Sequence, residues 1–343
     1  MNKMKKKLFI PITAILLLAQ SWLFAQDRIV DKYGKLSVKG NYIMSEYGDT
    51  VQLRGMSLFW SQWMPQYYNA DVVKWLRDDW KCTVVRAAMG VEMGGYEISP
   101  NTEKANVFRV VDAAIEHGIY IIIDYHSHEA HKNTLKAKVF FEEMSQKYGK
   151  YPNVLYEIYN EPLKETDWAE QIKPYSEKII RTIRQYDPDN IIICGTRQWS
   201  QMVSEAAADP IKANNIAYTL HYYAASHKMD LRIEAKRAIA KGACLFVSEY
   251  GTCEYNGNGI VDSISTREWW DFLDKHKISW CNWSIADKDE TAAALKPNPL
   301  PKGGWDESYI SPSGKLVRNE LILKNSAILA QKKKLTTSAK KKK

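Results

Sequence analysis

Two glutamates stand where polar side chains follow apolar runs. Glu161 lies in Asn160-Glu161-Pro162, after the run 154-VLYEIY, and Glu249 ends the run 244-CLFVS. Two carboxyl groups about 5 Å apart suit cleavage of a glycosidic bond with retention, one as the nucleophile and one as the acid and then the base. Either glutamate alone could equally be a surface or salt-bridged carboxylate. The chemistry therefore depends on whether the fold brings the two together.

The elements that must position them alternate regularly between apolar runs and segments of helical periodicity. Val- and Ile-rich runs fit strands buried on both faces of a parallel sheet. Eight strand-then-helix units predict an α/β fold, a (β/α)8 TIM barrel. A doubly wound open sheet is the second possibility, disfavoured because no Gly-rich phosphate turn follows the first strand. The expected strands are 51–58, 83–89, 119–126, 154–162, 190–196, 216–224, 244–251 and 279–286, and the expected helices are 71–80, 103–117, 134–148, 171–187, 200–208, 230–241, 265–276 and 313–330.

Glycines mark several element boundaries. Gly118 and Gly242 fall just past two expected helices, where a left-handed cap is favoured. Residues 28–50 carry Gly34, Gly40 and Gly48 as turn markers, and we expect them to form a short β-hairpin that plugs the bottom of the barrel.

Catalytic groups of such a barrel lie at the carboxyl ends of its strands. Glu161 ends the fourth strand and Glu249 the seventh, so they face each other across the mouth. Other polar or aromatic side chains at strand ends are Arg86, Asp124, His126, Asn160, His221, Tyr223, Ser248, Asn282 and Trp283.

These motifs resemble glycoside hydrolase family 5, in particular its secreted bacterial endoglucanases. The resemblance rests on Asn160-Glu161-Pro162 and on 248-SEYG about 90 residues later, and it extends to 73-VKWLRDDW, 83-TVVRAAM, 150-KYPNVLYEI, 190-NIIICGT, 280-WCNWS and 311-SPSG. It runs from about residue 29 to about residue 327.

The resemblance implies a role for each matching position. Glu161 would be the acid/base and Glu249 the nucleophile, and a nearby anion favours the protonated starting form that an acid requires. Arg86 would lie beneath Glu249 and Tyr223 would donate a hydrogen bond to it. The remaining polar positions would bind sugar hydroxyls: Asn160 the 2-hydroxyl, and His126 and His221 other hydroxyls, while tuning Glu161.

Aromatic side chains are abundant, with 12 Trp and 20 Tyr, and indole rings suit the flat C–H faces of sugars. The resemblance implies platforms at Trp63, Trp199 and Trp283. It also implies sugar contacts toward the non-reducing end for Lys288 and Glu290, whose alternative is a solvated charged loop. We expect Trp75, Trp80, Trp269 and Trp270 in the core and leave Trp60 and Trp305 unassigned.

Two positions depart from the family pattern, and one run suggests a different chemistry. Phe59 stands where many of these endoglucanases carry a histidine, and Gly90 where an aromatic residue is frequent, which leaves the preferred glucan open. His126, His128 and His131 could suggest a metal site, but they lack a regular ligand spacing. We expect no metal and no cofactor.

The two termini account for the excess of basic over acidic residues, with four lysines in 1–25, seven in 331–343 and no acidic residue in either. Residues 1–25 combine a lysine cluster with an apolar run and a small residue, Ala25, which predicts a secretory signal peptide cleaved after Ala25, with a retained N-terminal anchor as the alternative. Residues 331–343 hold seven lysines and predict a disordered tail, with a surface tether as a further possibility. The body between them, 26–330, is mildly acidic despite the net charge of +8, so nucleic-acid binding is not expected.

The predicted function is therefore a secreted, monomeric endo-β-1,4-glucanase that acts on cellulose or a related β-glucan, either in the periplasm or outside the cell. Mannan, xyloglucan and mixed-linkage glucan remain as substrates for the same chemistry. A non-catalytic carbohydrate-binding barrel remains as an alternative of another class. The cysteines number five, without a metal-type spacing, and we expect no disulfide.

Overall fold

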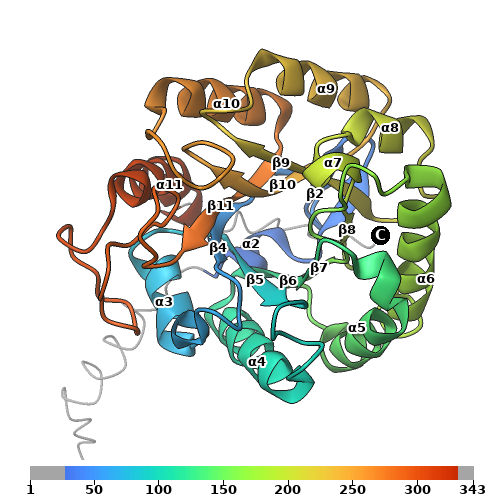
Figure 1. The fold of residues 1–343 in the computed structure, drawn as a ribbon, viewed down its shortest axis with the longest axis horizontal. Coiled ribbons are helices and arrows are strands. Elements are labelled where there is room, and N and C mark those ends of the chain that lie inside the picture. The colour runs from blue at the N-terminus through green and yellow to red at the C-terminus, as the bar shows by residue number, and fades with distance from the viewer. Residues whose placement is uncertain (1–27, 331–343) are drawn as a thin grey trace, which may run out of the picture.

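Eight parallel strands close into a barrel in the computed structural model, which describes residues 28–330 (Figure 1). The strands follow chain order around the barrel, and β11 pairs with β4 to close it. This confirms the predicted (β/α)8 architecture. The strands are β4 (Arg54–Leu58), β5 (Val84–Gly90), β6 (Tyr120–His126), β7 (Val154–Glu157), β8 (Ile192–Cys194), β9 (Ile216–Tyr223), β10 (Leu245–Gly251) and β11 (Ser279–Ile285).

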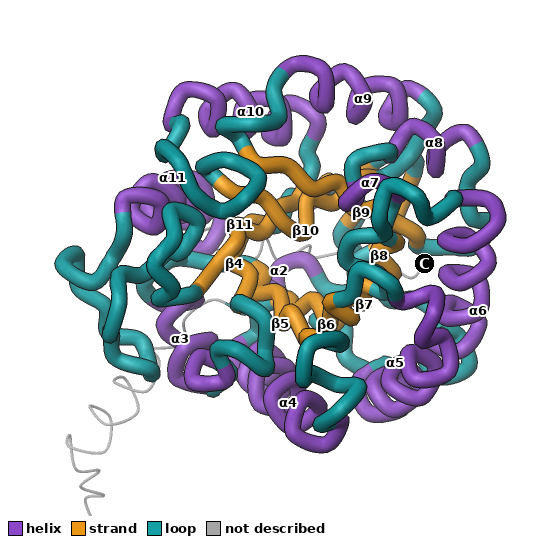
Figure 2. Tube along the Cα trace, viewed as in Figure 1, coloured by secondary structure: helices purple, strands orange, loops and turns teal. Residues whose placement is uncertain are grey.

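Helices form an outer ring around the strands (Figure 2). Nearly all lie where helical periodicity predicts them. They are α3 (Ala70–Asp78), α4 (Pro100–His117), α5 (Thr134–Tyr148), α6 (Lys173–Ile183), α7 (Arg197–Ser200), α8 (Val203–Ala208), α9 (Met229–Ala240), α10 (Ser263–His276) and α11 (Pro312–Ala330). The helix expected at 171–187 begins earlier, with a π-helical turn at Trp168–Ile172, and α6 ends at Ile183. The helix expected at 200–208 is preceded by a separate short segment, α7, because residues 198–200 have positive φ angles that a continuous helix cannot contain.

The core explains why the apolar runs become strands. Every residue of β5, β6, β10 and β11 is buried, as strands covered on both faces require. Trp80, Trp269 and Trp270 are buried as predicted, and Trp75 packs half-buried against the same core. Trp305, unassigned from the sequence, is also in the core, edge-on to Tyr67 and Trp80.

The N-terminal segment differs from the expected hairpin. The hairpin is present as β1 (Ser37–Lys39) and β2 (Tyr42–Met44), but β3 (Thr50–Val51) extends it to a three-stranded antiparallel sheet and α2 (Ile29–Tyr33) precedes it. The prediction missed α2 because a five-residue helix shows little periodicity; it is held by burial of its first two residues.

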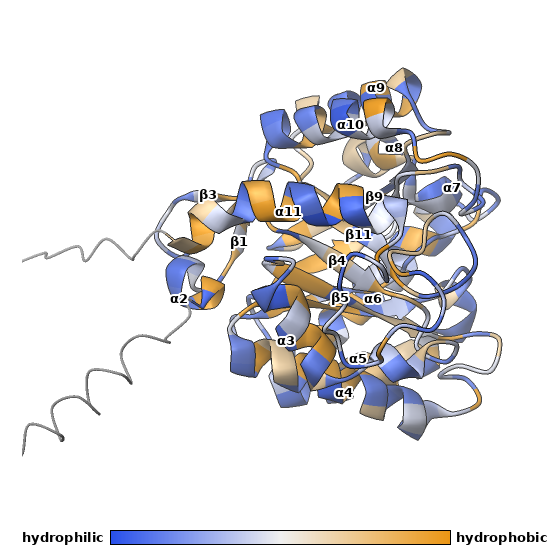
Figure 3. Cartoon of the chain, turned by 90° about the vertical axis from the view of Figure 1, so that its left-hand side faces the viewer, coloured by the Kyte–Doolittle hydropathy of each residue, from blue (hydrophilic) through white to orange (hydrophobic). Residues whose placement is uncertain are grey.

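This segment does cover the bottom of the barrel (Figure 3). The hydroxyl of Tyr120, the first residue of β6, donates to the carbonyl of Gly34 at 2.6 Å. The amide of Val30 donates to the carbonyl of Gly118 at 3.0 Å, just before β6 begins. The opposite end of the barrel is left to the loops that follow the strands.

Other predictions concern helix ends, cysteines and termini. Gly118 and Gly242 adopt positive φ angles, 68° and 87°, as predicted. All five cysteines are buried and free. The expected signal peptide (1–25) and lysine-rich tail (331–343) lie outside the described residues. Among residues 28–330, no helix is both long and apolar enough to cross a membrane.

Candidate active site

Glu161 and Glu249 meet at the mouth of the barrel. Glu249 lies in β10 and Glu161 in the loop that follows β7. An oxygen of each carboxylate and a ring nitrogen of His221 lie within 4.8 Å of one another. Glu249 is 5% exposed and the Glu161 side chain 14%, so both are partly shielded from solvent.

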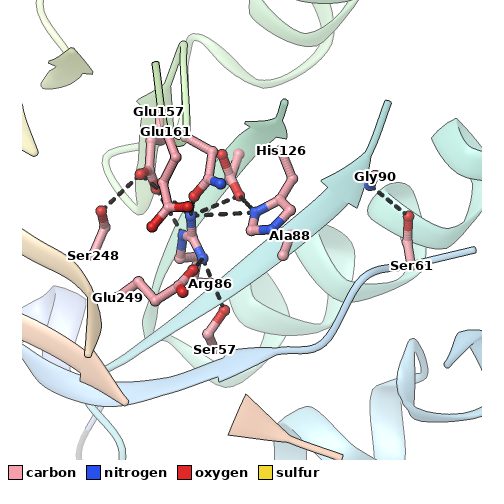
Figure 4. Close-up of polar contacts among 12 residues, drawn as sticks. Ser57, Ser61, Arg86, Ala88, Gly90, His126, Glu157, Glu161, Ser248 and Glu249 are labelled. Atoms are coloured by element: carbon pink, nitrogen blue, oxygen red, sulfur yellow. Dashed lines mark hydrogen bonds and ion pairs between the residues drawn. The ribbon is translucent and has the colours of Figure 1, made fainter. Parts of the chain in front are cut away.

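Arg86, on β5, lies beneath this pair and contacts several carboxylates at once (Figure 4). Its Nη1 is 3.1 Å from Glu249 Oε2, its Nη2 is 2.9 Å from Asp124 Oδ2, and its Nε is 2.7 Å from Glu157 Oε2. The guanidinium is fully buried. A buried arginine is stable only with such compensation, so the barrel fixes Arg86 in one orientation.

Glu157, on β7, is a residue of this network that the sequence interpretation missed. Burial alone would raise the pKa of Glu157, but Arg86 and His221 lower it to about 2, so it stays ionised. The sequence did hold a signal, because Glu157 is a single charged residue inside the apolar run 154-VLYEIY. A charge at such a position is rarely buried unless it is paired.

His221, on β9, joins the two halves of the network. Its Nδ1 is 2.9 Å from Glu161 Oε1, and its Nε2 is 3.0 Å from Ser248 Oγ. Ser248 in turn donates to Glu157 Oε1 at 2.7 Å. Burial opposes the charged ring, but Glu157 and Glu161 raise the pKa of His221 to about 9. At neutral pH the ring therefore carries a proton on both nitrogens.

The Glu249 carboxylate accepts two hydrogen bonds, one from a neutral donor and one from a charged donor. The Tyr223 hydroxyl donates to Oε1 at 2.9 Å, and Arg86 Nη1 donates to Oε2. Burial raises the pKa of Glu249, while His221, Arg86 and Tyr223 oppose this shift. Burial and the adjacent Glu249 raise the pKa of Tyr223 well above its ordinary value, so its hydroxyl keeps the proton it donates.

His126 and Asn160 also pack against Arg86. His126 Nδ1 lies 2.7 Å from Asp124 Oδ2, and Asn160 Oδ1 accepts from Arg86 Nη2 at 2.7 Å. Burial and Arg86 lower the pKa of His126 well below its ordinary value. The ring is therefore neutral, in contrast to His221.

A cleft runs across the mouth in two halves that share the carboxylate pair. The smaller half, of about 230 Å³, and the larger, of about 540 Å³, both include Glu161 and Glu249 in their walls. The smaller half is lined by the expected binding residues Trp63, His126, Trp283, Lys288 and Glu290. Phe59 and the unassigned Trp60 line it as well. The larger half contains Trp199, His221 and Tyr255.

Rings in the smaller half pack on one another. The rings of Trp283 and His126 are parallel, with an interplanar angle of 2° and centroids 5.2 Å apart. Trp63 is 48% exposed and stacks on Trp60 at 5.0 Å. Lys288 Nζ pairs with Glu290 Oε2 at 2.6 Å at the edge of this half.

Of the two departures from the family pattern, Phe59 lines the smaller half. Phe59 packs against Trp283, with ring centroids 5.2 Å apart. At Gly90 an added Cβ would lie 1.8 Å from Gln62 Oε1, so the Gln62 side chain occupies the space that a larger residue would need.

Trp199 in the larger half stands on a strained loop. Gln198, Trp199 and Ser200 are consecutive non-glycine residues with φ of 59°, 53° and 56°. The Trp199 amide donates to the Pro162 carbonyl at 2.8 Å, and the Ser200 hydroxyl donates to the Asn160 carbonyl at 2.7 Å. These hydrogen bonds tie the loop to the segment that carries Glu161. Such contacts with the surrounding structure allow a strained backbone to persist at a functional site.

The histidine run does not converge on a single point. The Nδ1 atoms of His126, His128 and His131 contact Asp124, the Glu161 carbonyl and the Tyr159 hydroxyl respectively. Within residues 28–330, one group has atoms close enough for a metal, Glu161, His221 and Glu249. Its oxygens already accept bonds from Arg86, Tyr223 and a cationic His221, a charge that disfavours metal binding.

The chain is similar in sequence to a known family of glycoside hydrolases. A family model described as cellulase (glycosyl hydrolase family 5) matches residues 44–289. Endoglucanase Z of Dickeya dadantii is 48% identical over 289 residues, which cover 83% of this chain and 65% of that protein. Endoglucanase A of Evansella cellulosilytica is 47% identical over 278 residues, which cover 80% of this chain and 57% of that protein. The chain thus spans less than two thirds of either relative.

Solved structures are similar over nearly their whole length. A structure from Cytophaga hutchinsonii is 65% identical, with a TM-score of 0.87 over 88% of this chain and 98% of that one. The catalytic domain of the Thermobifida fusca endoglucanase Cel5A is 37% identical, with a TM-score of 0.82 over 85% of this chain and 98% of that one. The family match spans all eight barrel strands and both glutamates, and the chain therefore belongs to glycosyl hydrolase family 5.

Proposed function

We propose that the protein is a secreted endo-β-1,4-glucanase that cleaves internal bonds of cellulose or a related β-glucan with retention of configuration. The observation that carries the proposal is that one carboxylate oxygen of Glu161 and one of Glu249 lie within 4.8 Å of each other. Retaining glycosidases hold their two carboxyl groups about 5–5.5 Å apart, whereas inverting enzymes leave about 6.5–9.5 Å for a water.

In the first step, Glu249 attacks the anomeric carbon while Glu161 gives its proton to the glycosidic oxygen. The bond to that oxygen breaks, the leaving sugar departs with the proton, and the other sugar is bonded to Glu249. Arg86 and Tyr223 hold the Glu249 carboxylate in place, which favours attack from a fixed direction. Asn160 contacts the 2-hydroxyl, a contact that strengthens in the transition state.

In the second step, a water attacks the same carbon and Glu161, now ionised, takes the water's proton. The bond to Glu249 breaks and both carboxyl groups return to their starting states. The cationic His221, 2.9 Å from Glu161, stabilises the carboxylate that forms between the two steps.

Several observations support a glucan as the substrate. Exposed or cleft-lining indoles, Trp63, Trp199 and Trp283, extend on both sides of the carboxylate pair. Relatives at 41–48% identity are named endoglucanases. A variant of the Thermobifida fusca catalytic domain, 36% identical, was solved in complex with cellotetraose.

The remaining parts of the proposal concern the whole chain. Residues 26–330 form the catalytic domain, acting as a monomer without metal or cofactor. Residues 1–25 are a signal peptide and 331–343 a lysine-rich tail. The basic start and apolar run of the N-terminus support secretion.

The test is release of reducing sugar from soluble carboxymethyl cellulose, with Glu249→Gln as the matched control. We expect activity in the wild type and none in the variant. Activity on mannan, xyloglucan or mixed-linkage glucan but not on carboxymethyl cellulose would reassign the substrate. A folded protein that binds these glycans and cleaves none would favour the binding-only barrel.

A further inference from the structure

We infer that Tyr255 is a substrate-contacting residue of the larger cleft half, where it and Trp199 hold the glucosyl units that leave in the first step. The inference rests on the proposed function and extends it to the leaving-group side. Tyr255 lies in the loop that follows β10 and was not among the residues expected from the sequence.

The larger half is the side that receives the leaving group. His221, which contacts the proton donor Glu161, lines the larger half and not the smaller. His126 and Trp283 line the smaller half and not the larger. Trp283 packs over Arg86, which lies beneath the nucleophile Glu249. The sugar that becomes bonded to Glu249 therefore occupies the smaller half, and the departing sugar the larger one.

Tyr255 is the point at which its loop reaches the larger half. Its neighbours Asn256 and Gly257 line the smaller half, whereas Tyr255 lines both. The larger half thus has two exposed aromatic rings, Tyr255 at 71% and Trp199 at 40% exposure, from the loops after β10 and β8. Rings on either side of β9 can hold consecutive glucosyl units by their apolar faces.

The backbone at Tyr255 is fixed, although its ring is free. The Tyr255 amide donates to Ser226 Oγ at 3.0 Å, the Ala225 amide to the Cys253 carbonyl at 3.0 Å, and the Ala292 amide to the Gly257 carbonyl at 2.9 Å. The Tyr255 side chain makes no hydrogen bond or ring contact with another residue in the range 28–330. An anchored backbone lowers the entropy cost of binding, and the ring and hydroxyl remain available for a sugar.

The test compares two substrates that share the smaller half and differ in the leaving group. Cellopentaose places glucosyl units in the larger half, whereas an aryl β-cellobioside places only an aryl group there. For Tyr255→Ala in the full-length chain, we expect the KM for cellopentaose to rise about three- to ten-fold, as loss of one aromatic contact implies. The kcat/KM for the aryl β-cellobioside should change less than about two-fold.

Two further variants separate contact from structure. Tyr255→Phe keeps the ring and should recover most of the affinity for cellopentaose. Tyr42→Ala removes another exposed tyrosine, 39% exposed in β2 at the other end of the barrel, and should leave the kinetics on both substrates unaffected. The thermal midpoint of unfolding should be the same in all four proteins, because neither side chain is part of the core.

The results that would overturn the role of Tyr255 differ from those that would overturn the proposed function. An unchanged KM for cellopentaose in Tyr255→Ala, or an equal loss on both substrates, would overturn the inference while leaving the glucanase intact. A wild type that is folded but inactive on cellopentaose and on the aryl glycoside would overturn the proposed function, and the inference with it.

Discussion

Arg86 and Glu157 form a two-point contact in the floor of the cleft, with Nε 2.7 Å from Oε2 and Nη2 3.3 Å from Oε1. Both side chains are fully buried. Through Ser248, Glu157 also reaches His221. Glu157 touches neither Glu161 nor Glu249. It nevertheless supports the two cations that contact them, Arg86 beside Glu249 and His221 beside Glu161.

Replacing Glu157 should therefore affect stability and activity together. Glu157→Gln keeps the shape but leaves Arg86 less compensated, and removing one partner of a buried pair costs about 3–5 kcal/mol. We expect a loss of about that size in the free energy of unfolding, measured by urea denaturation, and weaker activity. Glu116→Gln, at an exposed position on α4, is the matched control and should change neither. An unaltered stability of Glu157→Gln would show that the contact is not a structural requirement.

The raised pKa of His221 predicts a pH-dependent stability. Its folded-state pKa of about 9 lies above the unfolded value of about 6.5, so protonation favours the folded state. The contribution is complete below about pH 6.5 and is lost as pH rises through about 9. We expect the free energy of unfolding to fall over this window more steeply in the wild type than in His221→Gln.

His227 supplies the control for this measurement. Burial lowers the pKa of His227, so it titrates below the window and His227→Gln should keep the wild-type slope. Equal slopes for the wild type and His221→Gln would contradict a cationic His221.

Ser61 ties the aromatic loop of the smaller half to the barrel. Its hydroxyl accepts from the Gly90 amide at 3.0 Å and donates to Glu103, while its amide donates to the Ala88 carbonyl at 3.1 Å. The loop carries Trp60 and Trp63, so Ser61→Ala should raise the KM for cello-oligosaccharides more than it lowers kcat.

A serine of similar structural function tests whether this effect is specific. Ser45 Oγ accepts from the Asp49 and Tyr47 amides in the N-terminal segment. Ser45→Ala should lose a comparable stability, about 1–2 kcal/mol, without a change in KM. If both variants raise KM equally, Ser61 has no positioning role.

Two helix ends with left-handed backbones predict stability changes of opposite sign. Lys277, at the end of α10, has φ 57° and ψ 35°, a conformation that glycine adopts without the steric cost of a side chain. Lys277→Gly should therefore stabilise the protein by about 0.5–1 kcal/mol. Gly118→Ala, at φ 68° with a new Cβ 2.4 Å from Arg28 Cβ, should destabilise it by about 1–2 kcal/mol. Thermal unfolding of both variants measures the two signs, and a Gly118→Ala midpoint at or above that of the wild type would contradict the argument.

The barrel could be predicted from sequence because buried parallel strands require continuous apolar runs. Runs such as 119-IYIIIDYH leave no polar face, and each is followed by an amphipathic helix. The N-terminal helix α2 and the strained segment 197–200 could not be predicted from the sequence. Each has only four or five residues, which is too few to show a helical pattern of apolar residues. Their conformations are set by contacts with Gly118 and Pro162, which are distant in the chain.

The site was predictable to the extent that its residues lie at strand ends. Glu161, Glu249, Arg86, His221 and Tyr223 all meet at the mouth. Glu157 was missed because the expected strand 154–162 placed it inside the strand, whereas β7 ends at Glu157 and Glu161 follows in the loop. Tyr255 was missed because it lies well into a loop whose path depends on Ser226 and Ala292. The opposite charge states of His126 and His221 also depend on burial and partners, which residue type does not encode.

The most direct test of the central claim is the configuration of the sugar first released. Proton NMR of a cello-oligosaccharide digest, recorded before mutarotation, should show the β-anomer from the wild type and no product from Glu249→Gln. Initial release of the α-anomer, or normal turnover by Glu249→Gln, would contradict double displacement through Glu161 and Glu249.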